Sequence, residues 1–530
     1  MTAISPEPPF LSPPPRAILT NAFAAPFDNA VATARTCYSS RVIDTAEVSK
    51  DEQARELRDR IARETYQAGH HTTLQHASFQ FSVMNVSRQL LWSFLHAHPF
   101  YNSEQVSQRY VEVKPGHALV PNLPARELAL YEGTLERQMA AYHDLVRLLA
   151  PPVEAEYFRL FPGRAKSRER WLPQVKKRAQ EVARYTLPIA TFAHLYHTVS
   201  GLTLHRYHRL SRSSETPDEL RLLVEELVRA VSAHDPLFFR DLEDPLPLEE
   251  TPEARLLEGR GGVGAIGGAR ARLFRAEFDR GLAGLTSRLV DYKVAAEATL
   301  AQSVRTSVGL TRAELSDAEA IRRILSPEEN RLFAQSLTLT TLSKSSRALA
   351  HPHYTFQKRL SHSADSQDQR HRMVPASRPL LASQYAGGEP DAIVPELIRR
   401  TPEALERYDL SLRESFGAID ALLDAGVAPS TALYLLPNAF PIRFEESGDL
   451  LQLHHKWTSR LCYTAQEEIW RASLEEVRQV RDLHPLIGAQ LMPPCTLRDR
   501  AGVRPTCPEG PRYCGVPVWQ LPMERYERLI

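Results

Sequence analysis

Cysteine, net charge and long apolar runs are all scarce in this sequence. Five cysteines among 530 residues are too few for the disulfide framework of a small secreted domain. The 65 Lys and Arg balance 64 Asp and Glu, which leaves a formal net charge of +1 and no general electrostatic case for nucleic acid as a partner. The longest uncharged stretches, residues 65–87 and 185–205, are interrupted by His, Gln, Asn and hydroxyl residues, so we expect no membrane span.

The composition is that of a globular protein. At 43% hydrophobic and 24% charged residues, the chain can bury a large core, and its length suggests about three domains. The first 18 residues are rich in proline and have neither a basic start nor an apolar centre, so they predict a loose arm and not a targeting signal. We therefore expect a cytoplasmic protein.

One unit occurs twice along the chain, and this duplication decides the fold prediction. Residues 76–83 alternate apolar and polar side chains as a half-buried strand does, and residues 351–356 repeat the pattern 275 positions later. Thr216 and Thr464 each stand three positions before a glutamate, which predicts a capping box at the start of a helix in each copy.

The segment between the copies, residues 242–272, is rich in Pro, Gly and Glu and predicts a linker. Its residues 262–267 spell GxGxxG, but a dinucleotide site would need a strand before this motif, and none is indicated. The predicted organisation is an arm at 1–18, a first unit at 19–240, a linker at 241–284, a second unit at 285–483 and a tail at 484–530.

Both copies carry groups that could bind an anion. Ser107 and Arg109 are two residues apart and could face one ligand from a strand or an extended loop. Arg370, His371 and Arg372 place three donors within one helical turn or loop, which suits a phosphate or a flavin that carries negative charge. Taken singly, each pattern is more often a surface cluster of polar residues.

Together and in this order, the motifs resemble those of the flavin-dependent thymidylate synthases. The first copy has counterparts of the family's AARxxY segment at 32–38, of GHxSxxEH at 69–76, of SR at 87–88, of SxRY at 107–110 and of ARxxLP at 183–188. At the place of the family's RHR it has His96-Ala97-His98.

In the second copy the losses are reversed. Gln367 and residues 370–372 match QxxRHR, Arg460 occupies the arginine position before AQxEI, and residues 465–469 retain AQxEI itself. Leu380 and Leu433 stand where the family has a serine and the arginine of ARxxLP. The family's N-x-R-S-L helix is altered in both copies, which puts its flavin contacts in doubt.

The resemblance implies an α+β fold: two tandem helix-rich units with an antiparallel sheet each, followed by the short Cys-rich tail. Members of the family are homotetramers whose active sites lie between subunits. A duplicated chain could therefore form a homodimer that acts as a pseudo-tetramer, with one composite site built from the complementary motifs of the two copies. Under the rival interpretation both copies decayed independently and no complete site remains.

The implied activity is reductive methylation of dUMP to dTMP, with methylenetetrahydrofolate as carbon donor, NADPH as reductant and FAD as cofactor. Arginines would stabilise negative charge that develops on the pyrimidine carbonyls. The implied flavin-binding residues are Ser39, His76, Arg370, His371 and Arg372. The implied dUMP-binding residues are Gln105, Ser107, Arg109, Arg184, Gln367 and Arg460, and among these Ser107, Arg109 and Arg460 are the catalytic candidates. The alternatives are a catalytically degenerate homologue with a structural or regulatory role, and a flavoenzyme that acts on another pyrimidine.

The tail contains a separate candidate site. His484, Cys495, Cys507 and Cys514 could form a tetrahedral Cys₃His zinc site in a Gly- and Pro-rich setting. No CxxC pair is present, so ordinary buried thiols are an equal alternative, and an iron–sulfur cluster is a weaker one.

Overall fold

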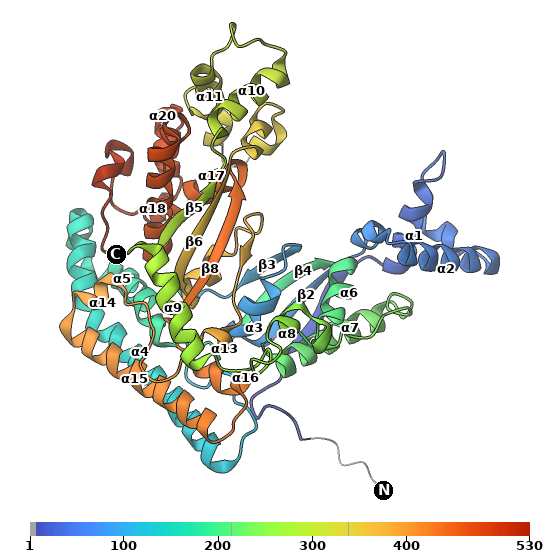
Figure 1. Ribbon diagram of the computed structural model, residues 1–530, viewed down its shortest axis with the longest axis horizontal. Helices are drawn as coiled ribbons and strands as arrows, with labels where there is room; N and C mark the ends of the chain where they lie inside the picture. The colour runs from blue at the N-terminus through green and yellow to red at the C-terminus, as the bar shows by residue number, and fades with distance from the viewer. Residues whose placement is uncertain (1–6, 214, 336, 338) are drawn as a thin grey trace. The chain divides into compact units, whose positions relative to one another are not determined.

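The computed structural model describes residues 7–530 except Ser214, Ser336 and Thr338, so the first six residues of the predicted arm lie outside the described residues. The chain divides into two compact units, each assembled from three stretches (Figure 1). Unit 1 comprises the chain up to residue 138 together with 188–266 and 415–436, and unit 2 comprises 139–187, 267–414 and 437–530. Residues 139–187 of the first copy thus belong to unit 2, and residues 415–436 of the second copy belong to unit 1.

Unit 1 contains a four-stranded antiparallel sheet in the order β1-β2-β4-β3. The strands are β1 (Arg16–Ala22), β2 (Ser78–Ser87), β3 (Tyr101–Gln105) and β4 (Phe192–Ser200). The predicted alternation at 76–83 is confirmed as β2, because Phe79, Phe81 and Val83 are fully buried while the residues between them are not. The end of the predicted arm is part of β1.

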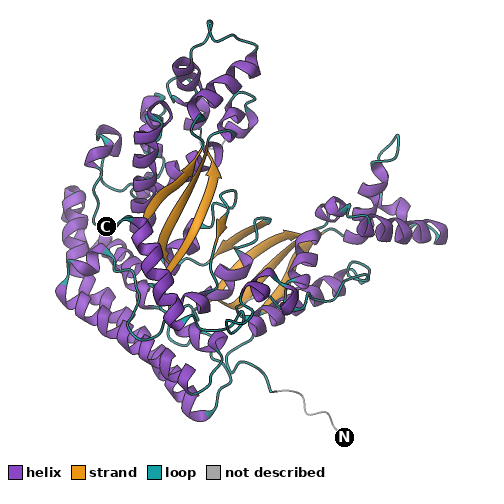
Figure 2. Cartoon of the chain, in the orientation of Figure 1, coloured by secondary structure: helices purple, strands orange, loops and turns teal. Residues whose placement is uncertain are grey.

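Unit 2 repeats this topology in the order β5-β6-β8-β7, again antiparallel. Its strands are β5 (Ser287–Tyr292), β6 (His353–Ser361), β7 (Ala376–Ser377) and β8 (Pro441–Asp449). The α+β class and the two antiparallel sheets that the resemblance implied are confirmed (Figure 2).

Helices surround each sheet, and each unit buries its own hydrophobic core. Two long helices, α4 (Ala125–Leu160) and α15 (Pro402–Asp424), begin in one unit and end in the other. The other helices of unit 1 are α1 (Pro26–Thr36), α2 (Glu52–Gln67), α3 (Arg88–Leu90), α6 (Gly201–Arg209), α7 (Pro217–His234), α8 (Pro252–Leu256) and α16 (Pro429–Ala432).

The remaining helices belong to unit 2: α5 (Arg168–Ala183), α9 (Gly268–Leu282), α10 (Ala296–Val308), α11 (Asp317–Leu325), α12 (His362–Asp368), α13 (Leu381–Gln384), α14 (Glu396–Arg399), α17 (Leu450–Arg460), α18 (Glu467–Leu483), α19 (Pro485–Gly488) and α20 (Pro494–Arg500). Across the part of the chain that the structure describes, no helix combines the length and the apolar character needed to cross a bilayer.

The segment predicted as a linker is ordered over much of its length. Helix α9 lies within it, and Arg275 on this helix donates from Nε and Nη2 to the carbonyl oxygen of Gln384, at 2.9 and 2.6 Å. Gly267, the last glycine of GxGxxG, packs so closely that a Cβ there would lie 2.1 Å from the carbonyl oxygen of Ser383. The motif therefore serves helix packing, because only glycine allows this approach.

In each unit a buried glutamate binds the segment that the other sequence copy contributes, which we call the exchanged segment: residues 415–436 in unit 1 and residues 139–187 in unit 2. In unit 1, Glu219 accepts hydrogen bonds from Ser87 N (2.5 Å) and Oγ (2.7 Å) and from the hydroxyl of Tyr434 (2.6 Å), a residue of the second copy. In unit 2, Glu468 accepts from Ser361 N (2.5 Å) and Oγ (2.7 Å) and from the hydroxyl of Tyr185 (2.6 Å), a residue of the first copy. The two units are thus stabilised by equivalent contacts.

These contacts correct the predicted capping boxes. Thr216 is the N-cap of α7, as predicted, but the Glu219 side chain binds Ser87 and Tyr434 instead of the helix start. In the second copy Gln466 occupies the N-cap of α18, so Thr464 lies outside the helix.

Candidate functional site

Helix α12 and the turn after it hold most of the second-copy candidates. The helix begins at His362 because the hydroxyl of Ser361 accepts a hydrogen bond from Ala364 N (3.0 Å), and it ends at Asp368. Arg370, His371 and Arg372 therefore lie in the loop that follows the helix, and not within a helical turn.

Arg460, the last residue of α17, reaches this loop. Its Nε donates to Nε2 of His371 (2.9 Å), and its Nη2 donates to the backbone carbonyl oxygen of Gln367 (3.1 Å). The structure thus brings together Gln367, His371 and Arg460, which are 93 positions apart at the most.

Arg184 from the first copy belongs to the same unit and is tied to the same helix. It is 6% exposed and opens the short helix η5 (Arg184–Thr186). Its carbonyl oxygen accepts from Nδ2 of Asn438 (3.0 Å), and the carbonyl oxygen of Asn438 accepts from Ser363 N on α12 (3.1 Å). Unit 2 therefore combines a dUMP candidate of the first copy with candidates of the second.

The charge state of this group follows from its surroundings. Burial and the neighbouring Arg460 guanidinium hold the pKa of His371 well below its usual range, so the imidazole is neutral. Because Nε2 accepts from Arg460, the ring proton resides on Nδ1, which remains a donor. Gln367 Oε1 is buried and has no hydrogen-bond partner among the described residues. The cluster offers a cation, a neutral donor and a buried acceptor, a set that can recognise a heterocycle and an anion.

A cluster of buried charges that the sequence analysis missed lies beside α12. Lys358 Nζ contacts carboxylate oxygens of Asp368 (2.8 Å), Glu446 (3.0 Å) and Glu476 (3.0 Å). Lys456 Nζ contacts Asp368 (2.9 Å) and also Glu446. All five side chains are at most 1% exposed. Burial alone would raise the pKa of Asp368, but the two ammonium groups hold it well below its usual range.

The signal for this cluster was present in β6. The buried face of that strand reads Tyr354, Phe356, Lys358, Leu360, so a lysine interrupts an apolar alternation. Such a residue needs buried carboxylates as partners.

The first-copy candidates of the SxRY motif stay together in unit 1. Gln105 ends β3, and the turn that follows carries Ser107 and Arg109. The Ser107 hydroxyl accepts from Arg109 N (3.2 Å), and the Arg109 guanidinium lies 5.5 Å from the ring centre of Tyr110. The sequence predicted a strand or an extended loop here, whereas the structure has a turn in which the Ser107 hydroxyl accepts from Arg109 N.

The two other first-copy candidates are on separate loops of unit 1. His76 is exposed at the end of the 3₁₀ helix η2 (His71–His76). Ser39 follows α1, and its hydroxyl accepts from Arg41 N (3.2 Å). The proposed roles of both residues remain predictions.

At the place of the family's RHR, unit 1 has His96 and His98 and no arginine. Burial and the charge of Arg206 lower the pKa of His98 to about 4, so its ring is neutral. The His96 ring stacks on Tyr101 with centroids 5.0 Å apart. This segment therefore lacks the two arginines of its counterpart in unit 2.

The structure does not show the zinc site predicted in the tail. Nδ1 of His484 lies 3.0 Å from the hydroxyl of Tyr354 in the core of unit 2. Cys495 is buried in α20, and Cys514 Sγ lies 3.5 Å from the carbonyl oxygen of Val516. Among the described residues, which include Cys507, no group of three or more His, Cys, Asp or Glu side chains is placed to hold a metal ion. Zinc is therefore not shown, and the ligand assignment stays a prediction.

Comparison with known proteins agrees with the duplication. The family of the thymidylate synthase complementing protein matches residues 19–237 and again residues 288–486. A flavin-dependent thymidylate synthase of Geobacter sulfurreducens is 28% identical over 171 residues, which are 32% of this chain and 70% of that protein. One from a Mycobacterium species (strain JLS) is 29% identical over 185 residues, 34% of this chain and 68% of the relative.

Two further similarities were found. The enzyme of Thermococcus onnurineus is 29% identical over 145 residues, 26% of this chain and 55% of its own length. A crystal structure of the Helicobacter pylori flavin-dependent thymidylate synthase ThyX, complexed with FAD and dUMP, is 20% identical, with a TM-score of 0.31 over 43% of this chain and 99% of that one. Because the two family matches cover more than half of the sequence, the chain belongs to the thymidylate synthase complementing protein family, as a tandem-duplicated member.

Proposed function

We propose that this protein is a flavin-dependent thymidylate synthase, which methylates dUMP to dTMP in the cytoplasm. Methylenetetrahydrofolate would supply the carbon, and NADPH would reduce FAD. The observation that carries the proposal is the group formed by Gln367, His371 and Arg460, to which Arg184 is joined through Asn438. The names of the relatives support the same activity.

Nucleotide binding would use the arginines and the glutamine of this group. Arg184 and Arg460 supply charge for the phosphate and the pyrimidine carbonyls, and Gln367 Oε1 supplies a buried acceptor that suits a ring N–H. From the first copy, Gln105, Ser107 and Arg109 would complete the dUMP contacts. Arg109 and Arg460 would stabilise negative charge that develops on the ring, with Ser107 as a further catalytic group.

The second-copy residues are suited to an anionic cofactor such as FAD. Arg370 is exposed on the turn after α12, and His371 presents a neutral N–H. FAD, when bound, supplies the hydride for the reduction. We assign its binding to Arg370, His371 and Arg372, with Ser39 and His76 from the first copy, and we propose a homodimer that acts as a pseudo-tetramer.

Two substitutions in different copies test the proposal. In the full-length protein, Arg109→Ala and Arg372→Ala should each abolish dUMP-dependent oxidation of reduced flavin. Arg372→Ala should weaken flavin retention, whereas Arg109→Ala should keep the yellow colour and lose dUMP affinity by about 10- to 150-fold, the effect of one charge-assisted contact. Arg312→Ala, at an arginine whose side chain is 76% exposed, is the matched control.

A mixture of the two variants distinguishes a site within one chain from a site shared by two. If the site draws on both chains, a heterodimer holds one intact site and regains partial activity. If both residues come from one chain, no activity returns. Sensitivity to only one of the two substitutions would contradict the composite site.

The neutral His98 of the first copy, at the place of the family's RHR, favours the second candidate, a degenerate homologue that binds flavin or nucleotide without turnover. Complementation of a thymidine auxotroph decides between the two. Failure to complement by a well-expressed yellow protein would favour the degenerate homologue, or a flavoenzyme for another pyrimidine.

A further inference from the structure

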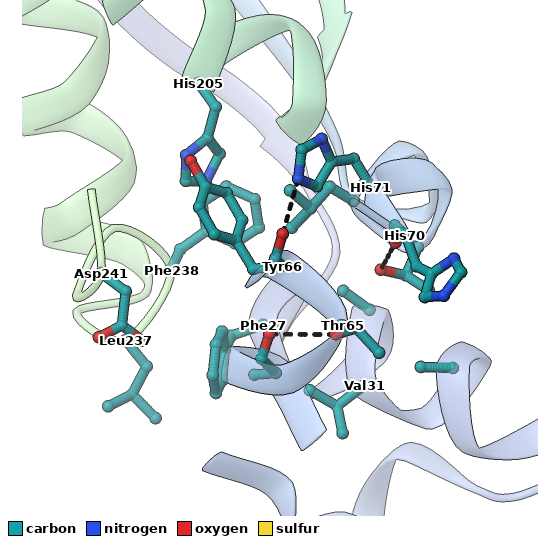
Figure 3. A pocket seen from close by; sticks show the side chains of 15 residues that line it. Phe27, Val31, Thr65, Tyr66, His70, His71, His205, Leu237, Phe238 and Asp241 are labelled. Carbon is teal, nitrogen blue, oxygen red and sulfur yellow. Dashed lines mark hydrogen bonds between the residues drawn. The ribbon is translucent and has the colours of Figure 1, made fainter. Parts of the chain in front are cut away.

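A pocket in unit 1 is lined by none of the residues assigned above. It opens between α1, α2, η2, α6 and the segment after α7, and its cavity volume is about 50 Å³ (Figure 3). Its walls are mostly apolar, with Phe27, Val31, Leu237 and Phe238 among them. Apolar walls with a few polar groups are typical of small-molecule sites.

His205 on α6 is the polar group that the fold leaves unsatisfied here. The residue is 7% exposed and lines the pocket, yet neither Nδ1 nor Nε2 has a hydrogen-bond partner among the described residues. By contrast, Nε2 of the neighbouring His71 lies 2.9 Å from the carbonyl oxygen of Tyr66 (Figure 3). Buried polar atoms without partners are rare and destabilising, so such a group calls for a water or a ligand.

The charge of His205 limits what can bind. Burial, together with the charges of His208 and His71, lowers its pKa to about 4, so the ring is neutral and offers one donor and one acceptor. Among the described residues that line the pocket there is no Lys or Arg, and the carboxylate of Asp241 is exposed. An anionic ligand would therefore find no counter-charge.

In the second copy an aromatic ring lies against the corresponding histidine. His454 is the fifth residue of α17, as His205 is the fifth residue of α6, and both helices follow a capped strand end. In unit 2 the ring of Phe333 lies 4.3 Å from that of His454. In unit 1 the described rings around His205 are farther away, at 5.2 to 5.9 Å.

We propose that this pocket binds a flat, uncharged nitrogen heteroaromatic ring, which takes the place that Phe333 has in unit 2 and exchanges hydrogen bonds with His205. The ligand edge carries a ring N–H or a ring nitrogen, and its faces contact the apolar walls. None of the proposed dUMP and flavin residues lines the pocket.

Binding of a matched pair of probes to the full-length protein tests this. Benzimidazole has one ring N–H and one ring nitrogen, whereas indene has the same shape without either. Calorimetry should show benzimidazole bound about tenfold or more tightly than indene. His205→Leu should remove the difference between the probes, and His117→Leu, at an exposed histidine of unit 1, should preserve it.

The stability of the variants completes the test. His205→Leu should leave the Tm of the ligand-free protein unchanged or raise it, because it removes unsatisfied buried atoms. If that variant fails to fold, Thr73→Trp, at the half-buried rim, should fill the pocket and abolish binding. Three results would overturn the proposal: equal affinity for both probes, binding that survives both substitutions, or no binding at about 1 mM. The absence of binding would mean that the pocket holds only water.

Discussion

Two lysines, Lys358 and Lys456, share the carboxylates of Asp368 and Glu446 in the core of unit 2. In unit 1 the corresponding strand position is Val83, because Val83 pairs with Leu195 on β4 as Lys358 pairs with Phe444 on β8. A cluster of this kind pays a large desolvation penalty, so it is retained only where every charge has its partner.

The first prediction concerns this cluster. Lys456→Met should lower the free energy of unfolding by about 3–5 kcal/mol, because Asp368 and Glu446 would then share one ammonium group instead of two. Urea denaturation followed by circular dichroism measures the change. Lys344→Met, at an exposed lysine, should change stability by less than about 0.5 kcal/mol. An equally small effect of Lys456→Met would show that the cluster does not stabilise the fold.

The second prediction follows from Glu219. Burial, opposed by hydrogen bonds from Ser87 and Tyr434, raises the pKa of Glu219 from 4.5 to about 6. A group whose pKa is higher in the folded state stabilises fully below its unfolded value, and this contribution is lost as the pH rises through the folded value. The free energy of unfolding should therefore fall by about 2 kcal/mol between pH 4.5 and pH 7.

Glu219→Gln should remove this part of the pH dependence, while Glu250→Gln, at an exposed glutamate, should retain it. Glu468, whose pKa is also raised by burial, contributes with the same sign, so the slope should be reduced and not abolished. An unchanged slope in Glu219→Gln would contradict the assignment.

At the scale of elements, the short segments around Tyr185 and Tyr434 are the exchanged parts. Each tyrosine lies in a short 3₁₀ helix. Its hydroxyl donates a hydrogen bond to a buried glutamate beside the sheet of the other copy. Backbone bonds extend the contact, from Ile189 N to Leu436 O (2.9 Å) in unit 1 and from Asn438 N to Leu187 O (2.8 Å) in unit 2.

The third prediction is that the two tyrosines are equivalent in energy. Tyr185→Phe and Tyr434→Phe should each lower the free energy of unfolding by about 1–3 kcal/mol, because a buried carboxylate loses one of its donors. Tyr196→Phe, at a side chain that is 56% exposed, is the control. A large effect at one tyrosine and none at the other would mean that only one unit depends on its exchanged segment.

The elements differ in how far local sequence determines them. Strand β2 was predicted from period-two alternation, which is a local property. The partner of Glu219 was not predictable, because Tyr434 is 215 positions away and the Thr-x-x-Glu pattern suggests a local cap. The contact between His484 and the Tyr354 hydroxyl, 130 positions away, could not be read from the spacing of His484 from the cysteines for the same reason.

At the scale of the whole molecule, interleaving ties the folding of each copy to that of the other. Residues 139–187 fold with residues 267–414 and 437–530, and residues 415–436 fold with the first sheet. The sequence motifs placed the copies at 19–240 and 285–483, close to the matched family regions, but the compact units do not follow these boundaries. A contiguous copy is therefore not a self-sufficient folding unit.

The last prediction tests this dependence by truncation. A fragment that ends at residue 284 retains 139–187 without most of unit 2, so the apolar residues of α4 and α5 that unit 2 buries, such as Leu149 and Val175, would be exposed. The same fragment lacks Tyr434, so Glu219 loses a donor within unit 1. We expect it to aggregate or to elute as an oligomer in size-exclusion chromatography, with a broadened unfolding transition. Supplying residues 285–530 in trans should restore a cooperative complex, because the missing stretches of both units are then present. If residues 1–284 instead gave a monodisperse, cooperatively folded monomer, the first copy would be independent of the second.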